Sequence, residues 1–213
     1  MEPTIGRIEV RKTARYFMYG DPELPYREIV FVLHGYGMQA GEFLKNFEAL
    51  QQPGRLIIAP EGLSRFYRKA FSGEVVASWM TKEDRLFDID DYINYLDDLF
   101  VKLSVNSSAK KIVIGFSQGV TTASRWLMNG KSRIDDFVIW CGEFATDTPQ
   151  FLAHAPRIWH VSAQKDEFIP LERFNKQLEY LKSMGFKVND YTFDDGHLIH
   201  QPTLIRLWND MNQ

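Results

Sequence analysis

The pentapeptide Gly115-Phe-Ser-Gln-Gly119 has the spacing G-x-S-x-G. It follows the apolar run Ile112–Ile114 and precedes a helical pattern that begins near Thr121. In this arrangement the serine lies at a sharp strand-to-helix turn, with its hydroxyl exposed above the sheet. The amide of the next residue lies at a helix start, where it can point at a developing oxyanion. The motif predicts Ser117 as a nucleophile and the Gln118 N–H as an oxyanion donor.

A second glycine-rich turn, His34-Gly-Tyr-Gly37, follows the apolar run Ile29–Leu33. Such a turn can aim a backbone N–H across the top of a sheet. The turn lies about 80 residues before the serine motif, the order expected for a second oxyanion donor. We expect the Tyr36 amide to be this donor, with Gly35 and Gly37 as alternatives. His34 is expected to shape the turn.

A nucleophilic serine of this type needs an acid and a histidine that follow it in the chain. Asp166 comes directly after the apolar run Ile158–Val161, and Glu143 comes after the run Phe137–Cys141. A carboxylate at the carboxyl end of a parallel strand lies at the same edge as the serine turn. It would orient the imidazole and stabilise the imidazolium. Both acids therefore remain candidates on position alone.

His197 follows Gly196 in an expected loop between a strand at 188–193 and the last helix. Its ordinary pKa lies near working pH, so it can accept the serine proton and return it to a leaving group. His200, three residues later, is the alternative base. His160 lies inside an apolar strand and is expected to be a hydrogen-bonded core histidine.

Apolar runs that do not alternate with polar residues are typical of strands buried on both faces of a parallel sheet. The runs are Ile29–Leu33, Leu56–Ala59, Ile112–Ile114, Phe137–Cys141 and Ile158–Val161. Between them, apolar residues spaced three or four apart predict helices at 89–103, 171–184 and 204–211. The alternation predicts an α/β fold with a mostly parallel central sheet and helices on both faces. Arg7–Arg11 alternates and is expected to pair with 14–19 as an N-terminal antiparallel hairpin.

The segment from Pro60 to Phe87 is long, has no clear periodicity and is rich in aromatic residues. Long structured insertions in compact domains are often functional. A packed surface loop is the other interpretation. The segment starts at the carboxyl end of a strand, the edge where open α/β sheets bind ligands.

The 213 residues predict one domain, 1–213, large enough for a full core. A net charge of −3 makes nucleic acid an unlikely partner, because there is no basic surplus for phosphates. The single Cys141 excludes an intrachain disulfide and a zinc site built from cysteines. No metal-binding or phosphate-loop motif is visible, so no metal is expected. No signal peptide or apolar run of bilayer length is seen, so we expect a cytoplasmic protein without a transmembrane segment. The oligomeric state is open, a homodimer included.

Taken together, these motifs resemble those of the carboxylesterase/phospholipase family of α/β-hydrolases, which includes the acyl-protein thioesterases. The matching features span nearly the whole chain: the HGYG turn, Ser78-Trp79 with Asp88-Ile89, GFSQG, Asp166–Pro170 and Gly196-His197. The chain departs from the family pattern at four places: Met38 after the HGYG turn, Met80-Thr81 after Ser-Trp, Val120 after GFSQG and Ala163 before the acid. The resemblance favours Asp166 over Glu143 as the acid.

The resemblance implies the α/β-hydrolase fold, no separate cap domain, no cofactor and serine-hydrolase chemistry on small acyl esters or thioesters. It also places the Ser-Trp pair near the site. We therefore expect an apolar acyl pocket formed by Phe66, Tyr67, Trp79, Met80, Leu198 and Ile199. Without a cap, this pocket predicts short to medium acyl substrates. Alternatives are a triad enzyme that cleaves a peptide or C–C bond, and a non-catalytic binding protein on the same scaffold.

Overall fold

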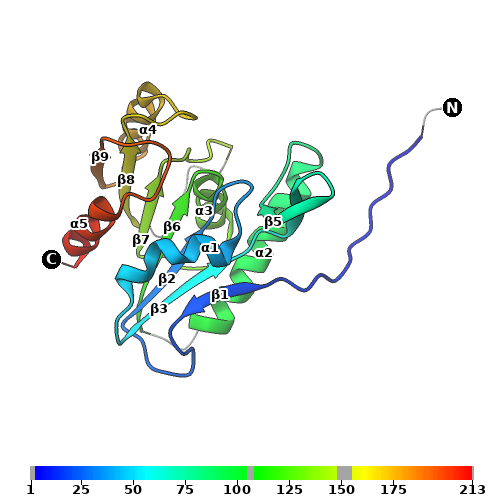
Figure 1. Cartoon of the computed structure of the whole chain (residues 1–213), viewed down its shortest axis with the longest axis horizontal. Coiled ribbons are helices and arrows are strands. Elements are labelled where there is room, and N and C mark those ends of the chain that lie inside the picture. The colour runs from blue at the N-terminus through cyan, green and yellow to red at the C-terminus, as the bar shows by residue number, and fades with distance from the viewer. Residues whose placement is uncertain (1–2, 105–107, 148–154, 213) are drawn as a thin grey trace.

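A seven-stranded sheet runs through the middle of the molecule (Figure 1), in a computed structural model that describes residues 3–104, 108–147 and 155–212. The strand order is β1-β3-β2-β6-β7-β8-β9, and every neighbouring pair is parallel except β1 with β3. The strands are β1 (Tyr16–Tyr19), β2 (Glu28–Leu33), β3 (Arg55–Pro60), β6 (Lys110–Phe116), β7 (Asp136–Trp140), β8 (Arg157–Ala163) and β9 (Val188–Phe193).

The five apolar runs form the five strands β2, β3, β6, β7 and β8, as predicted. Residues Ile29 to Leu33 and Leu56 to Ala59 are all inaccessible to solvent. Strands buried on both faces favour continuous apolar sequence because neither face meets water. The predicted strand at 188–193 is also confirmed as β9.

Helices cover both faces of the sheet (Figure 1). On one face, α2 (Arg85–Ser104) and α3 (Gln118–Asn129) bury their apolar sides. On the other face lie α1 (Ala40–Leu44), the 3₁₀ helix η1 (Lys45–Leu50) and α5 (Gln201–Met211). The helix α4 (Leu171–Ser183) contributes Leu181 to the first core and Phe174 to the second.

The predicted helices at 89–103, 171–184 and 204–211 correspond to α2, α4 and α5. α2 begins four residues earlier than its apolar pattern, and α5 begins at Gln201 with Pro202 in its first turn. Sequence reasoning missed α1 and η1, which are too short to show a helical period. Within the described ranges, no helix has both the length and the apolar content needed to cross a bilayer.

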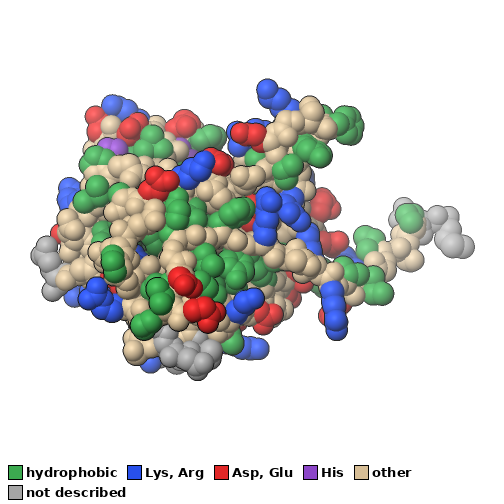
Figure 2. Space-filling view, turned by 60° about the horizontal axis from the view of Figure 1, so that its bottom comes forward, with side chains coloured by type: hydrophobic (Ala, Val, Ile, Leu, Met, Phe, Trp, Pro, Cys, Tyr) green, Lys and Arg blue, Asp and Glu red, His purple; other side chains and the backbone are tan. Residues whose placement is uncertain are grey.

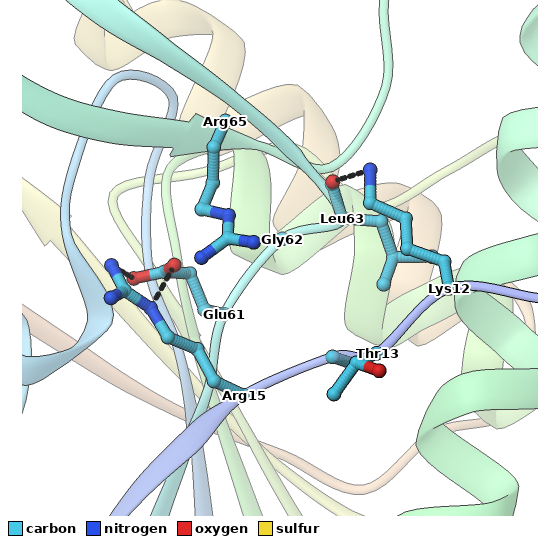
Figure 3. A pocket seen from close by; sticks show the side chains of 8 residues that line it. Lys12, Thr13, Arg15, Glu61, Gly62, Leu63 and Arg65 are labelled. Atoms are coloured by element: carbon cyan, nitrogen blue, oxygen red, sulfur yellow. Dashed lines mark hydrogen bonds and ion pairs between the residues drawn. The ribbon is translucent and has the colours of Figure 1, made fainter.

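The expected N-terminal hairpin is wrong. Residues 7–11 form no strand, and the side chains of Ile8 and Val10 are 87% and 79% exposed. The antiparallel edge strand does exist as β1, but its partner is β3, with Tyr16 opposite Pro60. Alternation marks a strand with one buried face. Here residues 12–15 lie along residues 61–65 (Figure 3), and the residues before them extend away from the sheet as an arm (Figure 1).

The aromatic-rich segment at 60–87 contains a second, two-stranded sheet, β4 (Ser64–Lys69) with β5 (Ser72–Ser78). This β4–β5 hairpin projects from the body and carries basic and hydrophobic side chains (Figure 2). Its base is joined to the turn after β2, because Ala77 donates to the Met38 carbonyl and Gly37 donates to the Ala77 carbonyl, each at 2.9 Å.

Candidate active site

Ser117 lies between the end of β6 and the start of α3, as the motif predicts. Its backbone has φ 54° and ψ −120°, a conformation that side-chain-bearing residues rarely adopt. Two hydrogen bonds hold this turn: the Ser117 amide donates to the Trp140 carbonyl at 3.1 Å, and the Val120 amide donates to the Ser117 carbonyl at 3.0 Å. Strain that surrounding contacts hold in place is typical of a functional residue.

Two glycines let the serine turn and the turn after β2 approach each other. A Cβ on Gly119 would lie 2.1 Å from the Leu33 carbonyl oxygen, closer than any real contact. A Cβ on Gly35 would lie 3.1 Å from the Cβ of Ser117. The parallel pairing of Leu33 with Gly115 brings both turns to the same sheet edge. The geometry therefore places the expected nucleophile beside the expected oxyanion loop.

Asp166 and His197 meet at this same edge. The imidazole Nδ1 of His197 lies 2.7 Å from Oδ2 of Asp166, and their side chains are 8% and 0% exposed. The other carboxylate oxygen, Oδ1, accepts the amides of Phe168 and Ile169 at 2.9 and 2.8 Å. Because both oxygens are held by hydrogen-bond partners, the carboxylate is fixed in orientation.

The alternative acid and base lie in other interactions. Glu143 pairs with Arg173 at 2.5 Å. His200 lies with Nδ1 2.9 Å from the Thr203 hydroxyl, and its ring stacks on Phe193. Of the candidates, the structure brings together only Asp166 and His197.

His160 is buried in β8, as expected, with Nδ1 2.8 Å from Oδ1 of Asp190. Its Nε2 is buried and has no hydrogen-bond partner among the described residues. His160 therefore lies in the core, as the apolar strand around it predicts.

Two phenylalanine rings flank the imidazole of His197. The ring of Phe116, the residue before Ser117, lies 4.7 Å from it, and the ring of Phe168 lies 4.9 Å away on an edge-to-face contact. Phe168 is 70% exposed and so presents an apolar surface beside the base. Sequence reasoning missed Phe168; its position two residues after the acid was the available signal.

His34 is buried and shapes the turn after β2 from inside, as expected. Its Nε2 accepts the Gly62 amide at 3.0 Å, so Nδ1 carries the proton and lies 2.7 Å from the Gly35 carbonyl oxygen. Burial lowers the pKa of His34, which favours this neutral form.

A small cavity of about 10 Å³ lies beside Gly62 and the ion pair of Glu61 and Arg15 (Figure 3). A cavity of that size holds at most a water molecule.

The expected oxyanion amides, those of Tyr36 and Gln118, are available. Among the described residues, no turn, loop or cap hydrogen bond uses either N–H. Gln118 is the first residue of α3, where helical amides have no acceptor within the helix. Both groups can therefore donate to an oxyanion.

Trp79 is not a pocket wall, which corrects the sequence prediction. Its side chain is 1% exposed, and its ring stacks on His34 with centroids 5.0 Å apart. The indole Nε1–H donates to the His34 carbonyl at 2.9 Å. Its aromatic surface packs against the turn after β2 and cannot also line an open pocket.

The side chain of Gln118 makes hydrogen bonds that sequence reasoning missed. Its Oε1 accepts the Trp79 amide at 3.2 Å, and its Nε2 donates to the Met80 carbonyl at 3.0 Å. The Ser78 hydroxyl lies 3.3 Å from the same Nε2. No sequence pattern distinguishes this role, because the fourth position of G-x-S-x-G tolerates any residue.

The other expected pocket residues divide into two groups. Phe66 faces the turn after β2, with its ring 5.6 Å from that of Tyr36, and Leu198 is 39% exposed beside His197. Tyr67 follows Phe66 in β4, so it points to the opposite face of the hairpin. Ile199 is 7% exposed within the second core. The expectation is therefore wrong for Ile199, which is buried in the core, whereas Tyr67 lies on the face of the hairpin opposite Phe66.

Met80 is half-buried, and its sulfur lies 3.1 Å from Arg125 Nη1. It packs against the first core rather than within it.

One group of side chains could in principle hold a metal ion. Ligand atoms of Cys141, Asp166 and His197 lie within 4.8 Å of one another. However, burial raises the pKa of the Cys141 thiol, which disfavours the thiolate that a metal requires. The facing atoms of Asp166 and His197 are also occupied by their mutual hydrogen bond. These features fit an acid–base pair better than a metal site.

Comparison with known proteins relates the chain to esterases through its fold. No protein-family model matches the sequence, and no curated protein is similar to it in sequence. Three solved structures illustrate the structural likeness. Esterase PE8 has a TM-score of 0.74 at 19% identity, covering 93% of this chain and 98% of its own. Acyl-protein thioesterase 2 from Zea mays has 0.74 at 18%, covering 94% and 98%. A carboxylesterase from Mesorhizobium loti has 0.72 at 16%, covering 92% and 94%.

These three structures, and that of a phospholipase/carboxylesterase from Dyadobacter fermentans, belong to the classes of protein that the sequence motifs resemble. The chain has the α/β-hydrolase fold, as predicted.

Proposed function

We propose that this chain is a serine hydrolase that cleaves carboxylic esters or thioesters through Ser117, His197 and Asp166. The observation that carries the proposal is the buried 2.7 Å contact between His197 and Asp166, at the same sheet edge as a serine held in a strained turn. The fold shared with an esterase, a carboxylesterase and an acyl-protein thioesterase supports the reaction class.

The first half of the reaction forms an acyl-enzyme. The Ser117 oxygen attacks the carbonyl carbon while its proton passes to Nε2 of His197, the nitrogen that Asp166 leaves free. The Tyr36 and Gln118 amides donate to the oxyanion of the tetrahedral intermediate. The bond to the leaving oxygen or sulfur then breaks, and the imidazolium returns its proton to that atom.

The second half repeats these steps with water. His197 takes a proton from water as the water oxygen bonds to the acyl carbon, and a second oxyanion forms between the same two amides. The serine oxygen leaves and regains the proton from His197, which releases a carboxylic acid. No cofactor enters either half of this scheme.

The apolar surface beside the base favours an acyl substrate. Phe168 and Leu198 are exposed next to His197, and Phe66 contacts the ring of Tyr36 across the oxyanion loop. Each buried methylene of an acyl chain contributes about 0.8 kcal/mol. With these few exposed walls, we propose that short to medium acyl chains are preferred.

A fluorophosphonate probe tests the proposal directly. The probe phosphonylates an activated serine, and peptide mapping of the adduct should place it on Ser117. Heat-denatured protein should not react, because activation requires the folded site. Folded protein that takes no label would contradict a serine hydrolase, and a label on another serine would contradict this site.

A further inference from the structure

The two oxyanion amides belong to segments that are far apart in sequence, so their spacing depends on what joins those segments. Tyr36 lies in the turn after β2, and Gln118 lies at the start of α3. An oxyanion hole works only when both donors lie within about 2.7–3.1 Å of the developing charge. A displacement of about 1 Å costs on the order of a hundredfold in rate.

The turn after β2 is held by the end of β5. The Trp79 indole donates to the His34 carbonyl at 2.9 Å, and the Gly37 amide donates to the Ala77 carbonyl at the same distance. His34 and Trp79 are also stacked, and neither is more than 1% exposed. The position of Tyr36 therefore follows the position of residues 77–79.

Residues 78–80 are in turn held by the side chain of Gln118. Its Oε1 accepts the Trp79 amide, and its Nε2 donates to the Met80 carbonyl. Both ends of the side-chain amide are thus bonded to one short stretch of backbone. Gln118 is half-buried, and hydrogen bonds that are partly shielded from water are costly to lose.

We propose that Gln118 and Trp79 are positioning residues that set the separation of the two oxyanion donors. Gln118 supplies one donor through its backbone and, through its side chain and Trp79, fixes the loop that supplies the other. This inference rests on the proposed function and goes beyond it, because it assigns a catalytic consequence to two side chains that do not touch the reacting atoms.

Gln118→Met is the direct test, since it keeps the backbone amide and the side-chain length but loses both side-chain hydrogen bonds. With a p-nitrophenyl ester, we expect kcat to fall about 10- to 100-fold while KM changes less than about threefold. The inhibition constant of a boronic acid, which forms a tetrahedral adduct with the serine, should rise in parallel with the loss of kcat. If the role of Gln118 is purely structural, the substitution should lower thermal stability, and the inhibition constant should not rise in parallel with the loss of kcat.

Trp79→Phe provides an independent variant that keeps a stacking ring and loses only the N–H donor and part of the ring area. We expect about a tenfold loss of kcat, a nearly unchanged KM and a parallel rise of the boronic acid inhibition constant. If Gln118→Met does not yield folded protein, Trp79→Phe decides the question alone.

Matched controls remove the same groups elsewhere. Gln177 bridges α4 to the loop after β7, accepting the Phe144 amide at 2.6 Å and donating to the Gly142 carbonyl at 3.0 Å. Trp126 donates its indole N–H to Asp97 at 2.8 Å within the first core. Gln177→Met and Trp126→Phe should lower stability but leave kcat within about twofold.

The outcomes separate the two proposals. A wild-type protein without turnover and without phosphonate labelling would overturn both. Wild-type turnover together with a Gln118→Met variant whose kcat stays within twofold would overturn the positioning role alone. Equal losses of activity in Gln118→Met and Gln177→Met would also overturn the positioning role and leave the hydrolase proposal standing.

Discussion

The junction between the serine turn and the oxyanion loop contrasts with the corner formed by the β4–β5 hairpin and the N-terminal arm. At the junction, Gly119 has no room for a single extra carbon, and His34 and Trp79 are buried. At the corner, Phe71 is 97% exposed and a Cβ on Gly6 would meet nothing within 4 Å. The difference indicates that the proposed chemistry depends on crowded backbone, whereas the exposed ends of the corner, at Phe71 and Gly6, have room for other side chains.

The two regions also differ in charge. Residues 3–15 and 64–78 contain seven Lys or Arg and two Asp or Glu, although the whole chain has a net charge of −3. Figure 2 shows these basic side chains over the hairpin and arm. The expected catalytic edge instead holds one buried carboxylate and one histidine.

The largest effect should come from the junction itself. Ser117→Ala should lower kcat/KM about 10⁴- to 10⁶-fold with the fold intact, because it removes the nucleophile and leaves the packing. Ester turnover and circular dichroism measure the two properties. Activity within tenfold of wild type would show that another residue attacks the substrate.

Asp166→Asn should cost about 10⁴-fold, because an amide can no longer hold the imidazole in the required tautomer. Glu143→Gln is the control, since Glu143 pairs with Arg173 at the protein surface. We expect less than about twofold change in kcat for the control. A larger loss for Glu143→Gln than for Asp166→Asn would reverse the assignment of the acid.

A stability measurement sharpens the contrast between crowded and open backbone. Gly119→Ala should lower the free energy of unfolding by about 3 kcal/mol or more, because the added carbon meets the Leu33 carbonyl oxygen. Gly6→Ala should change it by less than about 0.5 kcal/mol, since its position is open. Denaturant titration compares the two. Equal, small effects would mean that the junction relaxes easily.

The smallest effect concerns substrate choice at the hairpin. Phe66→Ala should reduce kcat/KM severalfold for medium acyl esters and leave acetate nearly unchanged, because it removes apolar surface beside the oxyanion loop. Tyr67→Ala is the matched control on the opposite face of β4. A p-nitrophenyl ester series from acetate to palmitate provides the measurement. A steady rise of wild-type activity to palmitate would contradict the short-chain preference, and identical profiles for both variants would remove the hairpin as a wall.

The sequence predicted the sheet and the meeting of Asp166 with His197 well, because both leave strong local signals. Buried parallel strands require continuous apolar runs, and the order of serine, acid and histidine restricts which residues can meet at one edge. The prediction of an N-terminal hairpin was wrong because alternation in residues 7–11 indicates that the segment could form a strand but does not indicate which strand it would pair with.

Side-chain roles in the aromatic segment could not be predicted for a different reason. Trp79 and Phe66 are both aromatic residues near the site, and only the tertiary neighbours make one a buried hydrogen-bond donor and the other a surface contact. The short elements α1 and η1 were missed because one turn of helix shows no periodicity. The side-chain contacts of Gln118 join segments that are distant in sequence, so no local sequence pattern predicts them.

The strand order also has a consequence for folding kinetics. The central pair β2–β6 joins Val30 to Ile112, and the intervening chain includes β3, the hairpin and all of α2. Pairings that close such long loops form slowly, because the chain entropy is lost before the contacts are gained. We therefore expect a refolding chain to recover helical circular dichroism first and ester turnover last. Ester turnover would then report the final step of folding.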